Sequence, residues 1–440
     1  MLSIILLAGG SSSRFSPLKE KNLYPFLGKS FVEWQLERYV AIKPRDLIVV
    51  ANEENIAEID SVIRAKNYDA KVVVQKGDGQ AGAVSTAIEH LSSSEDVLII
   101  NMNDVSEEIL LNSFLEKLEF LRSNNTNLLT GYYTETYFPG GYLVLNEEGN
   151  VIEVQEKPGA GKEPSKYVRL VFDYFHSVAE LKSALEKASS SKDDVYETAL
   201  ADMMKAGNKF FMLNYSGVWK TIKYHWHVLD VMEYYLSTIT TPSISSSATI
   251  AKTAVIKGNV IIEDNVKVFD GAVINGPAYI GKNCIIANNA LVRSSIIGND
   301  CVVGFASEVA RSYLRDNVWL HMNYIGDSVI ESNVSFGSTS LTANFRLDEQ
   351  NVKVLVKGEK VDSQKNKVGA IIGSNVRIGT GVNIMPGITI GSNSFVSSGA
   401  LLERDVAAGS FVKLKQELVV KENNFDISKT NRDEIKSKIK

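Results

Sequence analysis

A six-residue apolar period in the second half of the chain is the feature that most restricts its fold. Branched aliphatic residues recur at every sixth position, and small or aliphatic residues follow each of them four positions later. A short fixed period of this kind predicts a parallel β-helix, in which three hexads form one triangular coil that buries its inner face on the next. The period alone does not give the handedness. The repeating positions are Ile250, Ile256, Ile262, Val268, Ile274, Ile280, Ile286 and Val292, and then Ile372, Ile378, Ile384, Ile390, Val396 and Leu402.

Two features of this region depart from the plain repeat. Both cysteines of the chain, Cys284 and Cys301, fall at core positions of the array, so we interpret them as small buried hydrophobes. With two cysteines and no Cys-x-x-Cys pair, the sequence favours a reducing compartment, the cytoplasm. Between Asn344 and Val368 the hexad phase is lost in a polar, lysine-rich stretch, and long loops without structure of their own are often functional.

The first half of the chain alternates short apolar runs with amphipathic segments of helical length. This order predicts a doubly wound α/β sheet, since buried parallel strands are short and continuously apolar. Ser30 and Glu33 form a capping-box pattern at one helix start. The predicted strands cover residues 4–7, 47–50, 72–75 and 97–100, the helices residues 31–40, 81–91 and 110–121, and a hairpin residues 141–157.

Composition and charge limit the class of protein. Hydrophobic residues make up 44% and charged residues 22% of the 440 residues, which is typical of a folded globular chain. A net charge of −5 argues against nucleic acid as the main partner, and the absence of a long apolar run argues against a membrane span. The Ser-rich stretch around Pro242 predicts a boundary between a domain of residues 1–240 and a β-helix of residues 248–412, followed by a solvated tail of residues 413–440.

Polar residues follow several of the predicted parallel strands. Gly9-Gly10 leads through three serines to Arg14, Gln75 precedes a Gly79-to-Ala83 turn, and Asp104 follows another strand. The carboxyl ends of parallel strands meet at one edge of a sheet, where ligands bind, and successive backbone amides in such a turn can hold an anion. On the residues alone, ordinary strand-end turns remain an alternative at Gly9 and at Asp104.

The motifs at this edge resemble those of the sugar-1-phosphate nucleotidyltransferases. The family pattern L-A-G-G-x-G-T-R-x-x-P-L stands here as residues 7–18, with serines in place of the last glycine and the threonine, followed by Lys21-Asn22-Leu23 and Gly28-Lys29-Ser30. The resemblance implies a Rossmann-like domain that joins a nucleoside triphosphate to a sugar-1-phosphate and releases pyrophosphate. It implies catalytic roles for Arg14 and Lys21, nucleotide binding by Leu7, Ala8, Gly9, Gly10, Gln75, Gly79 and Ala81, and sugar binding by Gly141, Glu156 and Lys157.

The same resemblance implies a Mg²⁺ site, and the chain departs from the family there. Asp104 occupies the position of one metal ligand. Residues 219–227 align with the pattern W-x-D-V-G-x-P-W-D, in which Thr221 replaces the aspartate that is the second ligand. A threonine hydroxyl can ligate Mg²⁺ but supplies no negative charge.

Two segments of the second half resemble the acetyltransferase half of archaeal-type bifunctional N-acetylglucosamine-1-phosphate uridyltransferase/glucosamine-1-phosphate acetyltransferases. These are residues 320–328, with the pattern H-x-x-Y-x-G-D-S, and residues 336–346, with T-A-N-x-R. The resemblance implies a left-handed coil, a homotrimer, acetyl-CoA as co-substrate and a UDP-N-acetylglucosamine product. It implies that His321 deprotonates the acceptor amine, with an acceptor site of Arg311, Tyr324, Asn344 and Lys353.

Other functions are compatible with these features. The β-helix could be purely architectural. The chain could also be a diverged relative that has lost one or both activities and that binds nucleotide or sugar phosphate to regulate or scaffold an active partner. The replacement of the aspartate by Thr221 favours that alternative for the first half, whereas His321 and its motif favour an enzyme.

Overall fold

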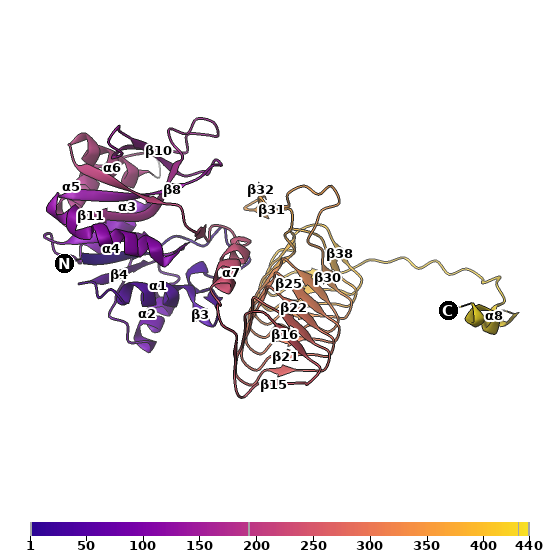
Figure 1. Ribbon diagram of the computed structural model, residues 1–440. Helices are drawn as coiled ribbons and strands as arrows, with labels where there is room; N and C mark the ends of the chain where they lie inside the picture. The colour runs from indigo at the N-terminus through magenta and orange to yellow at the C-terminus, as the bar shows by residue number, and fades with distance from the viewer. Residues whose placement is uncertain (1, 192–193, 430, 439–440) are drawn as a thin grey trace.

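A central set of parallel strands organises the first domain in the computed structural model, which describes residues 2–191, 194–429 and 431–438 (Figure 1). The spatial order of these strands is β6-β1-β4-β5, and all of them were predicted to within two residues. They are β1 (Leu2–Leu7), β4 (Leu47–Ala51), β5 (Lys71–Val74) and β6 (Asp96–Asn101). Their carboxyl ends therefore lie along one edge, as the site prediction requires.

Antiparallel strands extend this sheet beyond β6. β11 (Tyr167–Phe175) pairs antiparallel with β6 and connects it to the predicted hairpin, β9 (Gly141–Leu145) and β10 (Val151–Glu156). β8 (Thr126–Tyr133) pairs with β11 and with β12 (Lys209–Tyr215). A separate ladder joins β7 (Asp104–Ser106) to β13 (Trp219–Thr221) and so brings two distant segments to the sheet edge.

Helices cover both faces of the sheet, which confirms the doubly wound class. Ile4 and Leu6 of β1 pack in the core under α1 (Phe31–Val40), α2 (Ile56–Ala65) and α4 (Glu108–Ser123). Ile5 and Leu7 pack in the core under α3 (Gly79–Ile88), α5 (Val178–Lys187) and α6 (Val195–Lys205). This division follows from the alternation of side chains along a strand.

The ends of two helices bear on the sequence predictions. The capping box at α1 is confirmed: the Ser30 amide donates to Glu33 Oε2 at 2.6 Å and the Glu33 amide donates to Ser30 Oγ at 3.3 Å. α3 begins at Gly79, two residues earlier than predicted. Gly79 and Ala81 thus belong to the first helical turn rather than to a separate turn, and the Gly82 amide already donates to the Asp78 carbonyl.

The second half is a left-handed parallel β-helix of hexapeptide repeats, as predicted. Stacked turns place Asn265 beside Asn283, 18 residues later, which is three hexads, and the spacing shortens to 17 between Asn283 and Asp300. The predicted repeating residues, together with both cysteines, form one continuous core.

Each coil contributes to three parallel sheets. The first contains β14 (Ser243–Ile244), β17 (Val260–Ile262), β20 (Ala278–Ile280), β23 (Ile296–Ile297), β26 (Tyr313–Leu314), β28 (Val329–Ile330), β33 (Ile371–Ile372) and β36 (Thr389–Ile390). The second consists of two four-stranded parts that single bridges at Trp319 connect. The first part contains β15 (Thr249–Ile250), β18 (Lys267–Val268), β21 (Ile285–Ile286) and β24 (Val302–Val303), and the other contains β29 (Ser335–Phe336), β34 (Arg377–Ile378), β37 (Phe395–Val396) and β39 (Phe411–Val412). The third contains β16 (Val255–Lys257), β19 (Val273–Asn275), β22 (Leu291–Arg293), β25 (Glu308–Ala310), β27 (Tyr324–Gly326), β30 (Leu341–Thr342), β35 (Asn383–Ile384) and β38 (Leu401–Leu402).

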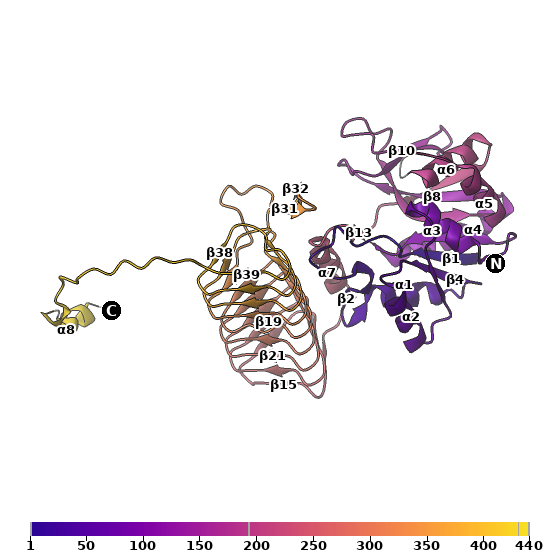
Figure 2. The ribbon, with the colours of Figure 1, turned by 180° about the vertical axis from the view of Figure 1, so that it is seen from behind.

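The first coil starts earlier than residue 248, where we predicted the β-helix to begin. β14 pairs with β17 through Ile244 and Ile262, so Ile244 lies one hexad before Ile250 and extends the repeat. The preceding helix, α7 (His227–Ser237), ends before the Ser-rich stretch and lies between the sheet domain and the coils in both views (Figures 1 and 2).

The polar stretch of residues 344–368 is not an unstructured loop, which corrects the prediction. It contains a hairpin of β31 (Lys353–Val356) and β32 (Glu359–Asp362), whose alternate valines Val352, Val354 and Val356 are buried. Buried valines alternate with exposed side chains along this strand, which gives it one apolar face. A period of two does not match the six-residue repeat, so the repeat did not predict the strand. These valines join a core that the two domains share with α7, and the Lys365 ammonium bonds Asp230 of α7 at 2.6 Å.

The remaining elements are short. η1 (Lys21–Leu23), β2 (Pro25–Phe26) and β3 (Lys29–Ser30) follow the first strand and face the coils. Beyond β39 the chain runs away from the coils to η2 (Ile427–Lys429) and α8 (Arg432–Ser437) (Figure 1). Within the described ranges, no helix combines the length and apolar character that a membrane crossing needs.

Candidate functional site

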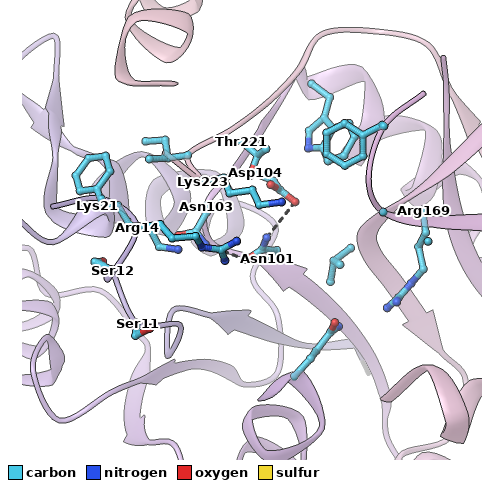
Figure 3. Close-up of a pocket in the computed structure, with 18 of the residues that line it drawn as sticks. Ser11, Ser12, Arg14, Lys21, Asn101, Asn103, Asp104, Arg169, Thr221 and Lys223 are labelled. Carbon is cyan, nitrogen blue, oxygen red and sulfur yellow. Dashed lines mark hydrogen bonds between the residues drawn. The ribbon is translucent and has the colours of Figure 1, made fainter. Parts of the chain in front are cut away.

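A cavity of about 290 Å³ lies at the carboxyl edge of the first sheet (Figure 3). The loop after β1, the junction of β6 and β7, the strand β13 and the hairpin β9–β10 all contribute to its wall. Predicted residues Arg14, Lys21, Asp104, Gly141 and Glu156 line it, together with Thr221. Segments more than one hundred residues apart in the sequence thus meet in one site.

Side chains from the segments that follow β1, β4 and β5 hold the loop after β1. The carboxamides of Asn22 and Asn55 both donate to the Ala8 carbonyl, at 3.3 and 3.0 Å. Gln75 lies against Gly9, where a Cβ would stand 2.0 Å from Gln75 Oε1, so a larger residue here would displace the Gln75 carboxamide. Gln75 also donates to the Gly79 carbonyl at 3.1 Å, which links the loop to the start of α3.

Three cations surround the predicted triphosphate position. Figure 3 shows Arg14, Lys21 and Lys223 extending from their segments into the same part of the cavity as Asp104. Burial, together with the charge of Arg14, lowers the pKa of Lys21, while Glu20 and Asp104 oppose that shift. Burial and the charges of Arg14 and Lys157 likewise lower the pKa of Lys223. Cations crowded together in this way indicate a site built for an anion.

Asp104 is the acidic centre of the cavity. It faces Thr221 across the β7–β13 ladder and accepts a hydrogen bond from Asn101 Nδ2 at 3.2 Å. Burial raises the pKa of its carboxyl to about 6, although Thr221, Trp219 and Asn101 oppose this rise. Burial thus disfavours the ionised carboxylate, and a cation bound beside it would favour the charged form.

The oxygen atoms around Asp104 fit a hard divalent cation. Asp104 Oδ1 and Asn103 Oδ1 are both buried and make no hydrogen bond. Mg²⁺ prefers oxygen ligands and uses one or two carboxylates together with substrate phosphates. No cluster of three His, Cys, Asp or Glu side chains suited to a metal occurs in the described ranges, so phosphate oxygens would have to complete the coordination.

The opposite end of the cavity carries two of the three predicted sugar-binding residues, Gly141 and Glu156, whereas Lys157 is not among the lining residues. Gly141 and Glu156 are partners in the β9–β10 ladder, and a Cβ on Gly141 would stand 3.1 Å from Glu156 Oε2. Lys157 reaches Glu156 at 3.1 Å and is otherwise largely exposed. The far wall includes Arg169, which is buried and bonded to Glu197 at 2.8 Å while its Nε has no partner (Figure 3).

Three of the residues predicted for the acetyl-acceptor site meet on the β-helix around Asp327, which the sequence prediction did not assign. Arg311 donates to both carboxylate oxygens of Asp327, at 2.7 and 2.6 Å. Asn344 Nδ2 bonds the same carboxylate and the Tyr324 hydroxyl, the latter at 3.2 Å. Arg311, Tyr324 and Asn344 therefore form one connected group, although they come from three successive coils.

The other two residues predicted for this site lie apart from that group. His321 is exposed at a coil corner, where its amide donates to Asn323 Oδ1 at 2.8 Å. Asn323 in turn donates to the Gly337 and Ser340 carbonyls at 2.9 Å and so ties the corner to the next coil. Lys353 stands exposed on β31, opposite Asp362, outside the hydrogen-bonded group.

Comparison with known proteins assigns both halves of the chain. Residues 3–236 match the nucleotidyl transferase family, residues 238–353 the GMPPB C-terminal domain, and residues 369–404 six bacterial transferase hexapeptide repeats. The chain belongs to the nucleotidyl transferase family. Its hexapeptide domain adds an acyltransferase-type half, and the protein is a transferase.

The relatives that are similar over nearly the full length of this chain are named as bifunctional proteins. The bifunctional protein GlmU of Methanococcus vannielii is 30% identical over 96% of this chain and 100% of its own length. The bifunctional sugar-1-phosphate nucleotidylyltransferase/acetyltransferase of Sulfurisphaera tokodaii is 30% identical over 94% of this chain and 100% of its own. GlmU of Methanocaldococcus jannaschii is 31% identical over 95% of this chain and 99% of its own length.

Sequence reasoning missed some residues that the fold brings into these sites. Lys223 lay within the aligned segment, at the position where the family pattern has glycine, and that departure was the available signal. Asp327 was part of the quoted H-x-x-Y-x-G-D-S pattern. Arg169 and Glu197 carried no motif, and only the fold places them at the cavity wall.

Proposed function

We propose that the protein transfers a nucleotidyl group from a nucleoside triphosphate to a sugar-1-phosphate and releases pyrophosphate. The observation that carries this proposal is one cavity in which Arg14 and Lys21 share a wall with Asp104, while Gly141 and Glu156 form the other end. Cations suit the triphosphate, and a carboxylate beside a tight glycine suits sugar hydroxyls. Membership of the nucleotidyl transferase family supports the same reaction.

In this proposal the loop after β1 binds the nucleotide. Gly9 and Gly10 would present backbone amides to the phosphates, while Leu7 and Ala8, whose amide donates to the Val50 carbonyl at 2.7 Å, form the strand end beneath the nucleotide. Gln75, Gly79 and Ala81 would approach the base. A phosphate oxygen of the sugar-1-phosphate attacks the α-phosphorus in line, the bond to the β-phosphate bridging oxygen breaks, and pyrophosphate leaves. Arg14 and Lys21 neutralise the charge that develops on the leaving group. Glu156 and Lys157 orient the sugar.

Asp104 and Asn103 would hold Mg²⁺ through their unpaired oxygens, with Thr221 contributing a neutral hydroxyl. When bound, Mg²⁺ supplies charge neutralisation to the phosphates and helps to orient them. Because Thr221 brings no charge to the metal, neutralisation of the phosphate charge would depend more on the cationic side chains of the cavity. Lys223 is one of these, at a position where the family pattern has glycine.

We propose further that the β-helix N-acetylates an amino-sugar-1-phosphate with acetyl-CoA, so that the coupled product is a UDP-N-acetylglucosamine-type nucleotide sugar. The connected group of Arg311, Tyr324 and Asn344 supports an acceptor site, to which Lys353 would contribute its charge. His321 would remove the proton of the acceptor ammonium before attack on the thioester. The bifunctional names of the full-length relatives support this pairing of activities.

The quaternary arrangement in this proposal is a homotrimer assembled through the β-helix. Exposed apolar side chains near the His321 corner support burial against another copy: Phe305, Trp319 and Met322 are 55%, 53% and 40% exposed. We also propose a division into a first domain of residues 1–240, a β-helix whose predicted range of 248–412 is extended back to β14 at Ser243, and a tail of residues 413–440. A cytoplasmic location is proposed as well, and the free cysteines support it.

The test is to incubate the purified chain with Mg²⁺, each of several nucleoside triphosphates and a panel of sugar-1-phosphates, with and without acetyl-CoA. Both pyrophosphate and free CoA are measured. Release of pyrophosphate that depends on one sugar supports nucleotidyl transfer despite Thr221. Release of CoA alone would leave only the acetyltransferase, and neither product would favour a binding or regulatory protein.

A further inference from the structure

Two segments flanking Lys21 rest on the β-helix through a buried polar network. Glu331, which follows β28 and is fully buried, accepts a hydrogen bond from the Lys19 amide at 3.1 Å. Arg315, which follows the adjacent strand β26, donates to the same carboxylate at 3.1 Å. A buried carboxylate with these two partners ties the chain just before Lys21 to the second domain.

The chain just after Lys21 is held by the same coils. The Arg315 guanidinium lies 5.2 Å from the centre of the Tyr24 ring, and the Tyr313 ring lies 5.0 Å from it on another side. The Tyr313 hydroxyl donates to the Pro25 carbonyl. Burial and the nearby charge of Glu331 raise the pKa of Tyr24 well above its usual value, as expected for a ring enclosed by this network.

These contacts reach Lys21 through the backbone. The Tyr24 amide donates to the Lys21 carbonyl at 3.3 Å and so closes the η1 turn. The backbone on the two sides of Lys21 is thus held at Lys19 and at Tyr24. The partners that hold these two residues, Glu331, Arg315 and Tyr313, belong to the β-helix and not to the domain that carries the cavity.

We propose that Glu331 and Arg315 of the β-helix are positioning residues for the nucleotidyltransferase site, because they fix the segment that aims Lys21 into the cavity. This inference rests on the proposed function only in taking Lys21 as a phosphate-binding group. The β-helix is then a structural component of the first site as well as the carrier of the second. Small displacements of such a group reduce catalysis strongly, since aligned charges lose effect when misplaced.

A double-mutant cycle tests the coupling, with inorganic pyrophosphate as the probe and calorimetry as the assay. Lys21→Met is expected to weaken pyrophosphate binding at least tenfold, and Glu331→Ala about tenfold. In the double variant the second loss should disappear, because Glu331 acts through Lys21. Additive losses would overturn the proposal, and so would unchanged binding in a folded Glu331→Ala protein.

Two further variants separate positioning from general destabilisation. Glu331→Gln keeps an oxygen for the Lys19 amide and should restore affinity to within about threefold of wild type. Tyr313→Phe removes only the hydroxyl that holds Pro25, and it replaces Glu331→Ala in the test if that variant does not fold. Tyr313→Phe should weaken pyrophosphate binding when Lys21 is present but not when it is added to Lys21→Met. The matched control is Glu308→Gln in the Arg293–Glu308 pair, 2.7 Å apart on other coils, which should leave pyrophosphate affinity unchanged.

Failure of this inference is distinguishable from failure of the proposed function. A wild-type protein that binds pyrophosphate with the expected coupling, yet makes no pyrophosphate from any substrate pair, would refute nucleotidyl transfer and keep the positioning role. A protein that turns over normally but shows additive losses would do the reverse. Equal loss of affinity in the Glu308→Gln control would attribute the effect to the β-helix fold in general and overturn the assignment.

Discussion

Replacing Asp104 with asparagine is expected to stabilise the first domain at neutral pH while abolishing nucleotidyl transfer. Burial raises the pKa of this carboxyl from its usual 3.8 to about 6. Since one pKa unit corresponds to about 1.4 kcal/mol, keeping the carboxylate ionised at pH 7 costs the folded state about 3 kcal/mol. Asparagine has the same shape and carries no charge, so the variant avoids that cost.

The sign of the pH dependence follows from the raised pKa. The penalty is present in full above the folded-state pKa, shrinks as the pH falls through about 6, and is nearly gone at pH 4, where the unfolded carboxyl also binds its proton. The stabilisation of Asp104→Asn over wild type should therefore decline from about 3 kcal/mol at pH 7 to about 0.5 kcal/mol at pH 4. A trade of stability for function of this kind is common at active sites.

Thermal unfolding at pH 7, 5 and 4 measures this difference, with the transition of the first domain followed separately. A gain of about 3 kcal/mol corresponds to a melting temperature roughly 6–12 °C higher for a domain of this size. In the same variant, pyrophosphate release should be lost and CoA release should be intact. The reasoning is refuted if the variant melts with wild type at pH 7, or if its advantage is the same at pH 4.

Three other predictions use single side chains. Lys223→Met should weaken nucleoside triphosphate binding about tenfold or more, because it removes a cation from the cavity. Lys220→Met, on the preceding strand β13, should leave the binding titration unchanged, and equal losses would argue against a direct role of Lys223. Burial lowers the pKa of His225 to about 3, below its unfolded value, so the stability of the folded state is greatest above pH 6.5 and falls as the pH drops. Between pH 7 and 5 the wild type should lose about 2 kcal/mol of unfolding free energy that His225→Phe retains, as measured by denaturant titration. The same pH dependence in both proteins would contradict this. His321→Ala should slow CoA release at least about 100-fold without affecting pyrophosphate release, and an unchanged acetylation rate would remove His321 from the mechanism.

The sequence predicted much of the fold because both domains consist of elements whose hydrophobic residues repeat at short, regular spacings. The hexads specified the β-helix core, since each residue of the repeat occupies the same place in its own coil. The apolar runs specified β1, β4, β5 and β6, which lie buried between two layers of helices. Their order along the chain implied a shared carboxyl edge, and Arg14, Lys21 and Asp104 line one cavity there. The residues predicted to bind the nucleotide through their backbone, Leu7 to Gly10, lie just before the lining residues Ser11 and Ser12.

Pairings between distant segments were beyond that kind of reasoning. In the hairpin at residues 353–362 the side chains alternate with a period of two, so the six-residue repeat is interrupted there and does not predict the hairpin. Arg169 and Glu197 have no spacing that marks them, and they meet the cavity only because β11 and α6 begin beside it. Lys353 shares the motif region with Asn344 in the sequence, yet the hairpin carries it away from the group around Asp327.

The sequence by itself determined the two architectures and the chemistry each can support, because local period and local motif depend only on neighbouring residues. The tertiary structure alone decided that Glu331 and Arg315 hold the segment around Lys21, more than 280 residues away. The charge of a buried carboxylate is satisfied by whichever partners the fold brings within hydrogen-bond reach. No pattern along one chain records that proximity, and so the dependence of the first site on the second domain appears only in three dimensions.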